Sequence, residues 1–154
     1  MKLGIVETEE QRELARALLK EYAASVELSE CWHSAIETEI EALPGPYSLP
    51  DGCLLLAYAE DQPAGCIAYK RIGEEACQMK RLYVRPAFRG KGIGRQLVIE
   101  LIARARQAGY AKMRLDTTPS METAIALYHS LGFQDVPAYQ SDTEGCALFM
   151  ELSL

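Results

Sequence analysis

Residues 84–95 read Val84-Arg85-Pro86-Ala87-Phe88-Arg89-Gly90-Lys91-Gly92-Ile93-Gly94-Arg95, and they lie between an apolar, strand-like run and a long amphipathic pattern typical of a helix. The glycines allow a tight turn and let a ligand approach backbone N–H groups. A helix N-terminus adds unpaired donors and the positive end of the helix dipole. The stretch therefore predicts an anion site, most simply for phosphate, although a plain tight turn on a basic surface would use the same residues.

Charge is unevenly distributed around this stretch. The net charge is −6, and the first 75 residues carry 15 acidic and 6 basic side chains. Residues 76–99 carry no acid and six bases, namely Lys80, Arg81, Arg85, Arg89, Lys91 and Arg95. A concentrated basic segment in an acidic chain favours a local anionic ligand, and it argues against a broad nucleic-acid surface.

The chain of 154 residues is long enough for one domain, residues 1–154, with a sizeable core. No apolar run approaches the ~20 residues of a membrane span, so we expect no membrane association. The N-terminus runs into acidic residues and does not resemble a signal peptide, so we expect a cytoplasmic protein. The five cysteines form no C-x-x-C pair and there are only two histidines, which argues against a metal site. Most of the cysteines lie in apolar runs, and we expect buried thiols.

Apolar side chains at helical spacing predict two helices before the prolines that begin at Pro44. Thr8 and Gln11 form a capping-box pattern, so the first helix is expected from about residue 9 to 26. The second passes through Trp32, Ile36, Ile40 and Leu43. We expect a loop at 44–52, with Tyr47 as a wall of a pocket.

Short apolar runs between turn residues predict an antiparallel meander of strands in the middle of the chain. The expected strands there are Cys53–Ala59, Ala64–Arg71 and Ala76–Val84, preceded by a short strand at Ile5 and Val6. After the glycine stretch we expect a helix from Ile93 that ends at Gly109, a strand Tyr110–Asp116, a helix capped by Ser120 and ended by Gly132, and strands Phe133–Val136 and Cys146–Leu152. This order predicts an α/β (α+β) fold with a mostly antiparallel mixed sheet of six to seven strands and helices on both faces.

Common phosphate-binding and catalytic motifs do not fit the chain. A dinucleotide fingerprint from Gly90 or Gly92 fails because its last position is Arg95 or Leu97. A P-loop fails because Arg85 stands where its first glycine should be and Gly92 follows Gly90-Lys91. The nucleophile elbow G-x-S-x-G is absent.

Two separated segments do fit a known pattern. The first is Leu82-Tyr83-Val84-x-Pro86 followed by Arg89-Gly90-Lys91-Gly92-Ile93-Gly94-Arg95, and the second is Ala124-Ile125-Ala126-Leu127-Tyr128-x-x-Leu131-Gly132-Phe133. With these segments the sequence resembles the GNAT superfamily of acyl-CoA-dependent N-acyltransferases, and the expected order of elements from about residue 3 to 152 agrees. The resemblance implies the GNAT fold, an acyltransferase activity, and acetyl-CoA or coenzyme A as co-substrate.

The resemblance also implies which residues hold the cofactor. The backbone of the strand at Leu82, Tyr83 and Val84 would bind the pantetheine arm. The glycine loop and helix start would bind the pyrophosphate through Arg89, Gly90, Lys91, Gly92, Ile93, Gly94 and Arg95. Lys80, Arg81 and Arg85 either help with the nucleotide phosphates or only balance the surface charge.

Tyr128 matches the tyrosine that the family commonly places near the thioester sulfur, where a phenol can protonate the leaving thiolate. The alternative is a core tyrosine on an apolar helix face. His129 points about 100° away from it around the helix, so we expect His129 at the surface. Tyr22, Trp32 and His33 could face the active site or belong to the core or its rim.

Two positions depart from the family pattern. Met121 stands where many members have an asparagine, which puts that cofactor contact in doubt. Gln78 stands where some members have a glutamate base, and an amide cannot take a proton at neutral pH. The general base is therefore open among the side chains of Glu37, Glu41, Glu74, Glu75 and His33, or a base reached through water, while Asp116 could equally cap the loop that follows it.

We therefore predict an N-acetyltransferase that moves an acetyl group from acetyl-CoA to an amine of a small molecule or peptide by direct attack. Cys77 and Cys146 as covalent acyl carriers lack an activating base. One alternative is a coenzyme A-binding module without transferase activity, and another is a nucleotide-binding protein of a different kind. The acceptor is unidentified, and a homodimer that pairs the strand Cys146–Leu152 between subunits is compatible with the sequence.

Overall fold

The computed structural model describes residues 1–25, 30–138 and 148–154, and within α2 the side chains from residue 36 onward. The strands are β1 (Lys2–Ile5), β2 (Cys53–Ala59), β3 (Gln62–Arg71), β4 (Ala76–Val84), β5 (Lys112–Thr117), β6 (Gln134–Val136) and β7 (Leu148–Ser153). The helices are α1 (Glu9–Ser25), α2 (Glu30–Ala42), α3 (Ile93–Gln107) and α4 (Glu122–Ser130), with short 3-10 turns η1 (Gly45–Tyr47) and η2 (Pro86–Phe88). None of the described helices has both the length and the apolarity that crossing a bilayer requires.

The strands form a seven-stranded sheet in the order β1-β2-β3-β4-β5-β7-β6. Every neighbouring pair is antiparallel except β4 and β5, which run parallel. The predicted meander of β2, β3 and β4 and the mostly antiparallel mixed sheet are both confirmed.

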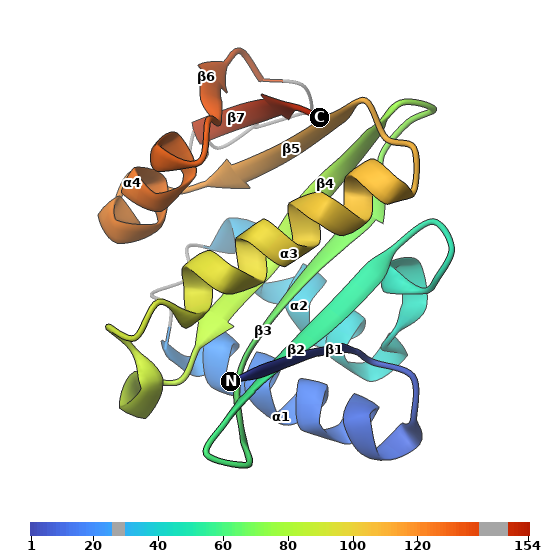
Figure 1. Cartoon of the computed structure of the whole chain (residues 1–154), viewed down its shortest axis with the longest axis vertical. Coiled ribbons are helices and arrows are strands. Elements are labelled where there is room, and N and C mark those ends of the chain that lie inside the picture. The colour runs from blue at the N-terminus through green and yellow to red at the C-terminus, as the bar shows by residue number, and fades with distance from the viewer. Residues whose placement is uncertain (26–29, 139–147) are drawn as a thin grey trace.

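Helices cover both faces of the sheet, as the sequence predicts. Figure 1 shows α3 crossing one face in front of β3 and β4, with α1 and α2 behind the sheet. The predicted apolar rows of α3 are buried in the core on the α3 face, together with Tyr128 of α4. Leu18, Leu19 and Ile36 are buried in a second core, between the other face of the sheet and the helices α1 and α2. Burial of two apolar faces of the sheet is the main favourable contribution to folding here.

Local sequence signals account for several helix ends. The capping box at the start of α1 is present, because the Gln11 backbone N–H donates to Thr8 Oγ1 over 3.1 Å and the Thr8 backbone N–H donates to Gln11 Oε1 over 2.9 Å. Gly109 lies just beyond α3 with a φ of +94°, as a C-terminal cap requires.

Several predicted boundaries are wrong, and one of them is the start of β3, which lies at Gln62 and not at Ala64. The first strand lies at Lys2–Ile5, with Val6 N–H bonded to the Leu54 carbonyl beyond its end. β5 begins at Lys112, because the Tyr110 backbone N–H belongs to the C-terminal cap of α3, where it donates to the Ala105 carbonyl over 3.2 Å. Ser120 does not cap α4: the helix begins after Met121, and the Ser120 hydroxyl pairs with that of Thr118.

β4 contains a β-bulge that bears directly on the site. Cys66 pairs with Tyr83 and Ala68 with Lys80, so two residues of β4, Arg81 and Leu82, lie opposite one residue of β3. Arg81 has a φ of +65°, a conformation that is strained for a residue with a Cβ. The bulge turns the following part of β4 out of register with the rest of the strand.

Candidate active site

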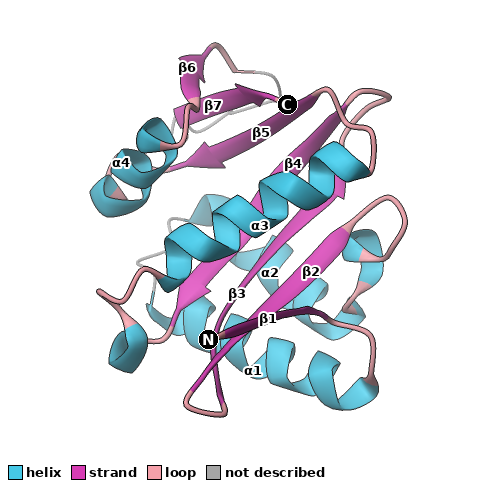
Figure 2. Ribbon diagram, in the orientation of Figure 1, coloured by secondary structure: helices cyan, strands magenta, loops and turns pink. Residues whose placement is uncertain are grey.

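The site lies where β4 and β5 separate. The two strands pair only from Ala76 with Lys112 to Gln78 with Arg114, and Figure 2 shows them running apart toward their C-terminal ends. Beyond Gln78 no described strand pairs with the β5-facing edge of β4. Backbone groups on this edge therefore lack a strand partner and are open to a ligand or a side chain, since each unpaired N–H or C=O needs a partner.

A cleft of about 690 Å³ begins at this gap and extends to the start of α3. Its walls include the predicted cofactor residues Leu82, Tyr83, Val84, Arg89, Gly90, Gly92, Ile93, Gly94 and Arg95. Lys91 is not among the lining residues, and its ammonium lies 5.6 Å from the centre of the Phe88 ring.

The glycine loop presents backbone donors to the cleft. Gly90 and Gly92 have φ values of +78° and +80°, which glycine adopts without strain. The first main-chain bond of α3 runs from Gln96 N–H to the Gly92 carbonyl, so the N–H groups of Ile93, Gly94 and Arg95 have no partner within the helix. Together with the helix dipole, these donors give this end of the cleft the features that suit an anion.

Two arginines add positive charge at this end of the cleft. The Arg89 Nε donates to the Val84 carbonyl over 2.9 Å, and the Arg95 Nη1 donates to Ser130 Oγ over 3.1 Å. Each bond uses one of the five N–H donors of a guanidinium, so donors remain for a phosphate. The bonds hold both side chains beside the helix start.

Three other basic side chains of residues 76–99 form ion pairs with acidic side chains outside that segment. Arg85 forms a two-pronged pair with Glu21 of α1, with its Nη2 2.6 Å from Oε2 and its Nε 3.0 Å from Oε1. Arg81 is buried with its Nε 2.8 Å from Glu39 Oε2, and Lys80 Nζ lies 3.8 Å from Glu39 Oε1. Of the two alternatives for these bases, the geometry favours charge balance over phosphate binding.

A second, smaller cavity of about 70 Å³ adjoins the cleft in the gap between β4 and β5. The two share the lining residues Tyr22, Leu82, Met121 and Ala124, which therefore mark the place where they meet. Beyond that place the small cavity is lined by Lys80, Arg81, Asp116 and Tyr128, among others. Tyr22 thus lies at the site and also belongs to the core between the sheet and α1, so both of its predicted alternatives hold.

Tyr128 reaches the small cavity from α4. Its side chain is buried against Phe133, with ring centroids 5.8 Å apart. Burial, followed by the nearby Tyr22 and Asp116, raises the pKa of Tyr128, so the hydroxyl is protonated at neutral pH. Within the described part of the chain the hydroxyl has no hydrogen-bond partner. Both features are compatible with a proton donor and with a core tyrosine at the cavity wall.

Gln78 and Asp116 form a contact that the sequence did not predict. The Gln78 Nε2 donates to Asp116 Oδ1 over 2.7 Å; Gln78 belongs to the last pair of β4 and β5, and Asp116 lies two residues beyond its partner Arg114. Gln78 is only 1% exposed. A signal was present in the sequence, since both polar residues occur in otherwise apolar strands, but their partnership depends on the pairing of β4 with β5.

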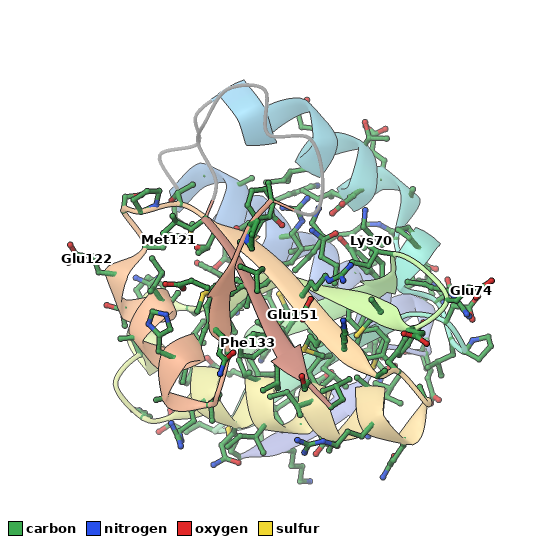
Figure 3. The ribbon with its side chains drawn as sticks, turned by 90° about the horizontal axis from the view of Figure 1, so that it is seen from above. Lys70, Glu74, Met121, Glu122, Phe133 and Glu151 are labelled. Atoms are coloured by element: carbon green, nitrogen blue, oxygen red, sulfur yellow. The ribbon has the colours of Figure 1, made fainter. Side chains whose placement is uncertain are left out.

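Other residues at the mouth of the cleft were also missed. Ser120, Glu122 and Thr123 line it, at the turn that leads into α4 and on the first turn of that helix. The sequence gives only a weak signal for these residues, because small polar residues are common at helix N-termini whether or not a ligand binds there. Figure 3 shows Met121 and Glu122 together on this side of the molecule.

Several predicted candidates lie away from the site. Glu74 appears on the opposite side from Met121 in Figure 3, and Glu75 precedes the paired end of β4. Tyr47 as a pocket wall is wrong: it is buried against α2, its hydroxyl donates to Glu39 Oε2 over 2.8 Å, and it lines neither cavity. Trp32 and His33 lie outside the described side chains.

The predicted positions of His129 and of three cysteines are confirmed. His129 is exposed, with its Nε2 2.9 Å from Asp135 Oδ1. Cys53, Cys66 and Cys77 are free and buried. Burial raises the pKa of the Cys77 thiol to about 12, which argues against a role as an acyl carrier because the thiolate is the nucleophile. Cys146 lies outside the described residues.

Comparison with known proteins identifies relatives of this chain. Residues 12–133 match the profile of the Acetyltransferase (GNAT) family. An uncharacterised N-acetyltransferase of Schizosaccharomyces pombe is 38% identical over 110 residues, which are 70% of this chain and 68% of that protein. An uncharacterised N-acetyltransferase of Dictyostelium discoideum is 27% identical over an alignment that covers 100% of both chains.

A solved structure shares the fold. The paia N-acetyltransferase of Thermoplasma acidophilum, solved in complex with coenzyme A, matches with a TM-score of 0.74 over 100% of both chains. The two sequences are 22% identical. The match covers the whole chain, from β1 to β7.

Proposed function

Because this chain belongs to the acetyltransferase (GNAT) family, we propose that it transfers the acetyl group of acetyl-CoA to an amine of a small molecule or peptide. The relatives are named N-acetyltransferases, and the chain is an acyltransferase of that family. The proposal extends to a single catalytic domain over residues 1–154, with acetyl-CoA as co-substrate in the cleft.

The observation that carries the proposal is the junction of the two cavities. At one end the cleft offers the free N–H groups of Ile93, Gly94 and Arg95, which suit a pyrophosphate. At the other end it meets the small cavity that holds Tyr128. A long cofactor with a phosphate group at one end and a thioester at the other fits this arrangement.

Binding would use the residues that line the cleft. The loop Gly90–Gly92 and the start of α3 would bind the pyrophosphate, with Arg89 and Arg95 as flanking cations. The β5-facing edge of β4 at Leu82, Tyr83 and Val84 would bind the pantetheine amides through its unpaired backbone groups. Lys91 would contribute long-range charge, since its ammonium lies over Phe88.

The chemistry would be direct attack of the amine on the thioester carbon. The C–N bond forms as the carbonyl π bond opens, and backbone N–H groups near Leu82–Val84 stabilise the oxyanion. The C–S bond then breaks, and Tyr128 gives its proton to the thiolate of coenzyme A. The nitrogen carries a positive charge after the attack and loses one proton to solvent, and the tyrosinate takes up a proton from solvent.

A thiol-release screen tests the proposal. Full-length protein is incubated with acetyl-CoA and each of a set of amines: free amino acids, polyamines, aryl-alkylamines and short peptides with free N-termini. Release of coenzyme A thiol above the amine-free background for at least one amine supports transfer. Calorimetric binding of coenzyme A without thiol release for any amine would support the binding-module alternative, and preference for ATP over coenzyme A would contradict both.

A further inference from the structure

The small cavity contains one carboxylate among the described residues that line it, that of Asp116. Asp116 is the second-last residue of β5 and lies beyond the last pair of β4 and β5. The two cations in the same lining, Lys80 and Arg81, are both held by Glu39 on α2. Asp116 is therefore the group in the cavity with a negative charge available for an incoming ammonium.

The Asp116 carboxylate is fixed in orientation, but only one of its two oxygens has a hydrogen-bond partner among the described residues. Oδ1 accepts the hydrogen bond from Gln78 Nε2 over 2.7 Å. Oδ2 has no hydrogen-bond partner among the residues that the structure describes. Because Gln78 is buried and itself held within the sheet, the bond limits rotation of the carboxylate and leaves one oxygen for a ligand.

Asp116 and Tyr128 approach the gap from opposite faces of the sheet. Leu115 belongs to the core on the α3 face, and successive side chains of a strand alternate, so Asp116 points toward the α1 and α2 side. Tyr128 comes from α4 on the α3 face. A group held in the small cavity would thus have a proton donor on one side and a proton acceptor on the other.

We propose that Asp116 takes the proton of the acceptor amine, with Gln78 as the residue that positions it. The inference rests on the proposed function and names the base that the function needs. The ammonium of the acceptor donates to Oδ2, one N–H bond breaks, and its electron pair becomes the lone pair that attacks the thioester carbon. The proton passes from Asp116 to solvent. A carboxylate at this position also selects acceptors that are cationic at the attacking nitrogen.

Three variants of the full-length protein test the inference. Asp116→Asn keeps the size of the side chain and an oxygen for Gln78 but removes the proton acceptor. Asp51→Asn is the matched control, because Asp51 is an exposed aspartate that pairs with Arg71 at the opposite end of β4. Gln78→Glu combined with Asp116→Asn restores a carboxylate within reach of the same oxygen position.

The assay is thiol release with acetyl-CoA and the amine that gives the fastest release with the unaltered protein. We expect Asp116→Asn to lower kcat by about 100-fold or more, in the range that general base catalysis supplies, with an unchanged dissociation constant for coenzyme A. Asp51→Asn should keep the original rate. The Gln78→Glu change should restore part of the rate in the Asp116→Asn background, which a purely structural role of Asp116 would not produce.

The outcomes separate this inference from the proposed function. If the unaltered protein releases thiol and Asp116→Asn does so at a similar rate, Asp116 is not the base although the function stands. If Asp116→Asn loses activity together with coenzyme A binding, or if no carboxylate at position 78 restores any rate, the role is structural and the inference fails. If the unaltered protein transfers to no amine, the proposed function and this inference both fall.

Discussion

The buried guanidinium of Arg81 lies 2.8 Å from Glu39, and this contact attaches the bulge of β4 to helix α2. Arg81 is strained, with a φ of +65°, and only 4% exposed. The same carboxylate also accepts the Tyr47 hydroxyl over 2.8 Å. One glutamate on α2 thus holds the strand edge that borders the site.

Glu39→Gln should destabilise the fold, because it leaves the buried Arg81 without a full counter-charge. We expect a loss of about 3 kcal/mol in the free energy of unfolding, measured by urea titration, because glutamine keeps a hydrogen-bonding oxygen but removes the charge. Glu41→Gln on the exposed side of the same helix is the control and should change little. Equal stability of the Glu39 and Glu41 variants would show that the pair does not hold the bulge.

The ion pair of Glu39 and Arg81 should make the free energy of unfolding depend on pH. Burial alone raises the pKa of Glu39, but the hydrogen bond and charge of Arg81 outweigh it and hold the pKa below its usual value. A carboxyl with a lowered folded-state pKa stabilises the fold above its unfolded pKa, and that contribution is lost as pH falls through the folded value. The stability difference between the unaltered protein and Glu39→Gln should therefore shrink as the pH falls below 4.5, the ordinary pKa of a glutamate. A difference that stays constant over this range contradicts the assignment.

Tyr128→Phe should remove activity and leave the fold intact. The hydroxyl has no described partner, so its loss breaks no hydrogen bond, while the thiolate loses its proton donor. We expect kcat to fall by about 100-fold with little change in coenzyme A affinity. Tyr69→Phe, at a tyrosine that is 2% exposed in the same core and lines neither cavity, is the control. A Tyr128→Phe protein as active as the control would make Tyr128 a core residue.

Gly92→Val should weaken coenzyme A binding. A β-branched residue is strained at a φ of +80°, so the loop must rearrange and the N–H groups at the start of α3 move. We expect calorimetry to show a dissociation constant raised about tenfold or more. Gly73→Val is the matched control, because Gly73 has an ordinary φ and open space where its Cβ would lie. Arg95→Ala tests the same phosphate end without altering the backbone, and unchanged affinity in both cleft variants would place the pyrophosphate elsewhere.

The buried cysteines should be unreactive in the native protein. Burial raises the pKa of Cys53 to about 11 and that of Cys66 to about 12. In a Cys31→Ser/Cys146→Ser variant, we expect no reaction with Ellman's reagent until the protein is unfolded, after which three thiols react. Rapid labelling of the folded variant would contradict the burial and would also complicate any thiol-release assay.

Most of the fold could be predicted because its signals are local. The apolar rows of α3, the capping box of α1 and the short turns of the meander depend on residues close together in the sequence. The structure of residues 84–95 could also be predicted, since a strand, a glycine turn and a helix start follow one another in the sequence. Ser120 and Tyr110 were misplaced, and for Tyr110 the error arises because its backbone N–H donates to the Ala105 carbonyl in the C-terminal cap of α3.

The side chains around the reacting atoms could be predicted only in part, because their partners are distant in the sequence. Tyr128 follows from a family pattern, but the pairing of Gln78 with Asp116 joins residues 38 apart and exists only once β4 and β5 are side by side. Arg85 is a basic residue in a basic segment, and the neighbouring sequence does not reveal that it forms an ion pair with Glu21, 64 residues earlier. Such partnerships are products of the tertiary structure.

The central claim is that one cleft brings acetyl-CoA and an amine together for transfer. The most direct measurement uses acetyl-CoA labelled in its acetyl group, with mass spectrometry of the amine and parallel measurement of free coenzyme A thiol. The account predicts labelled N-acetyl product and thiol in equal amounts, both absent when acetyl-CoA is withheld. Thiol release without acetylated amine, or no release with any amine although coenzyme A binds, would contradict it.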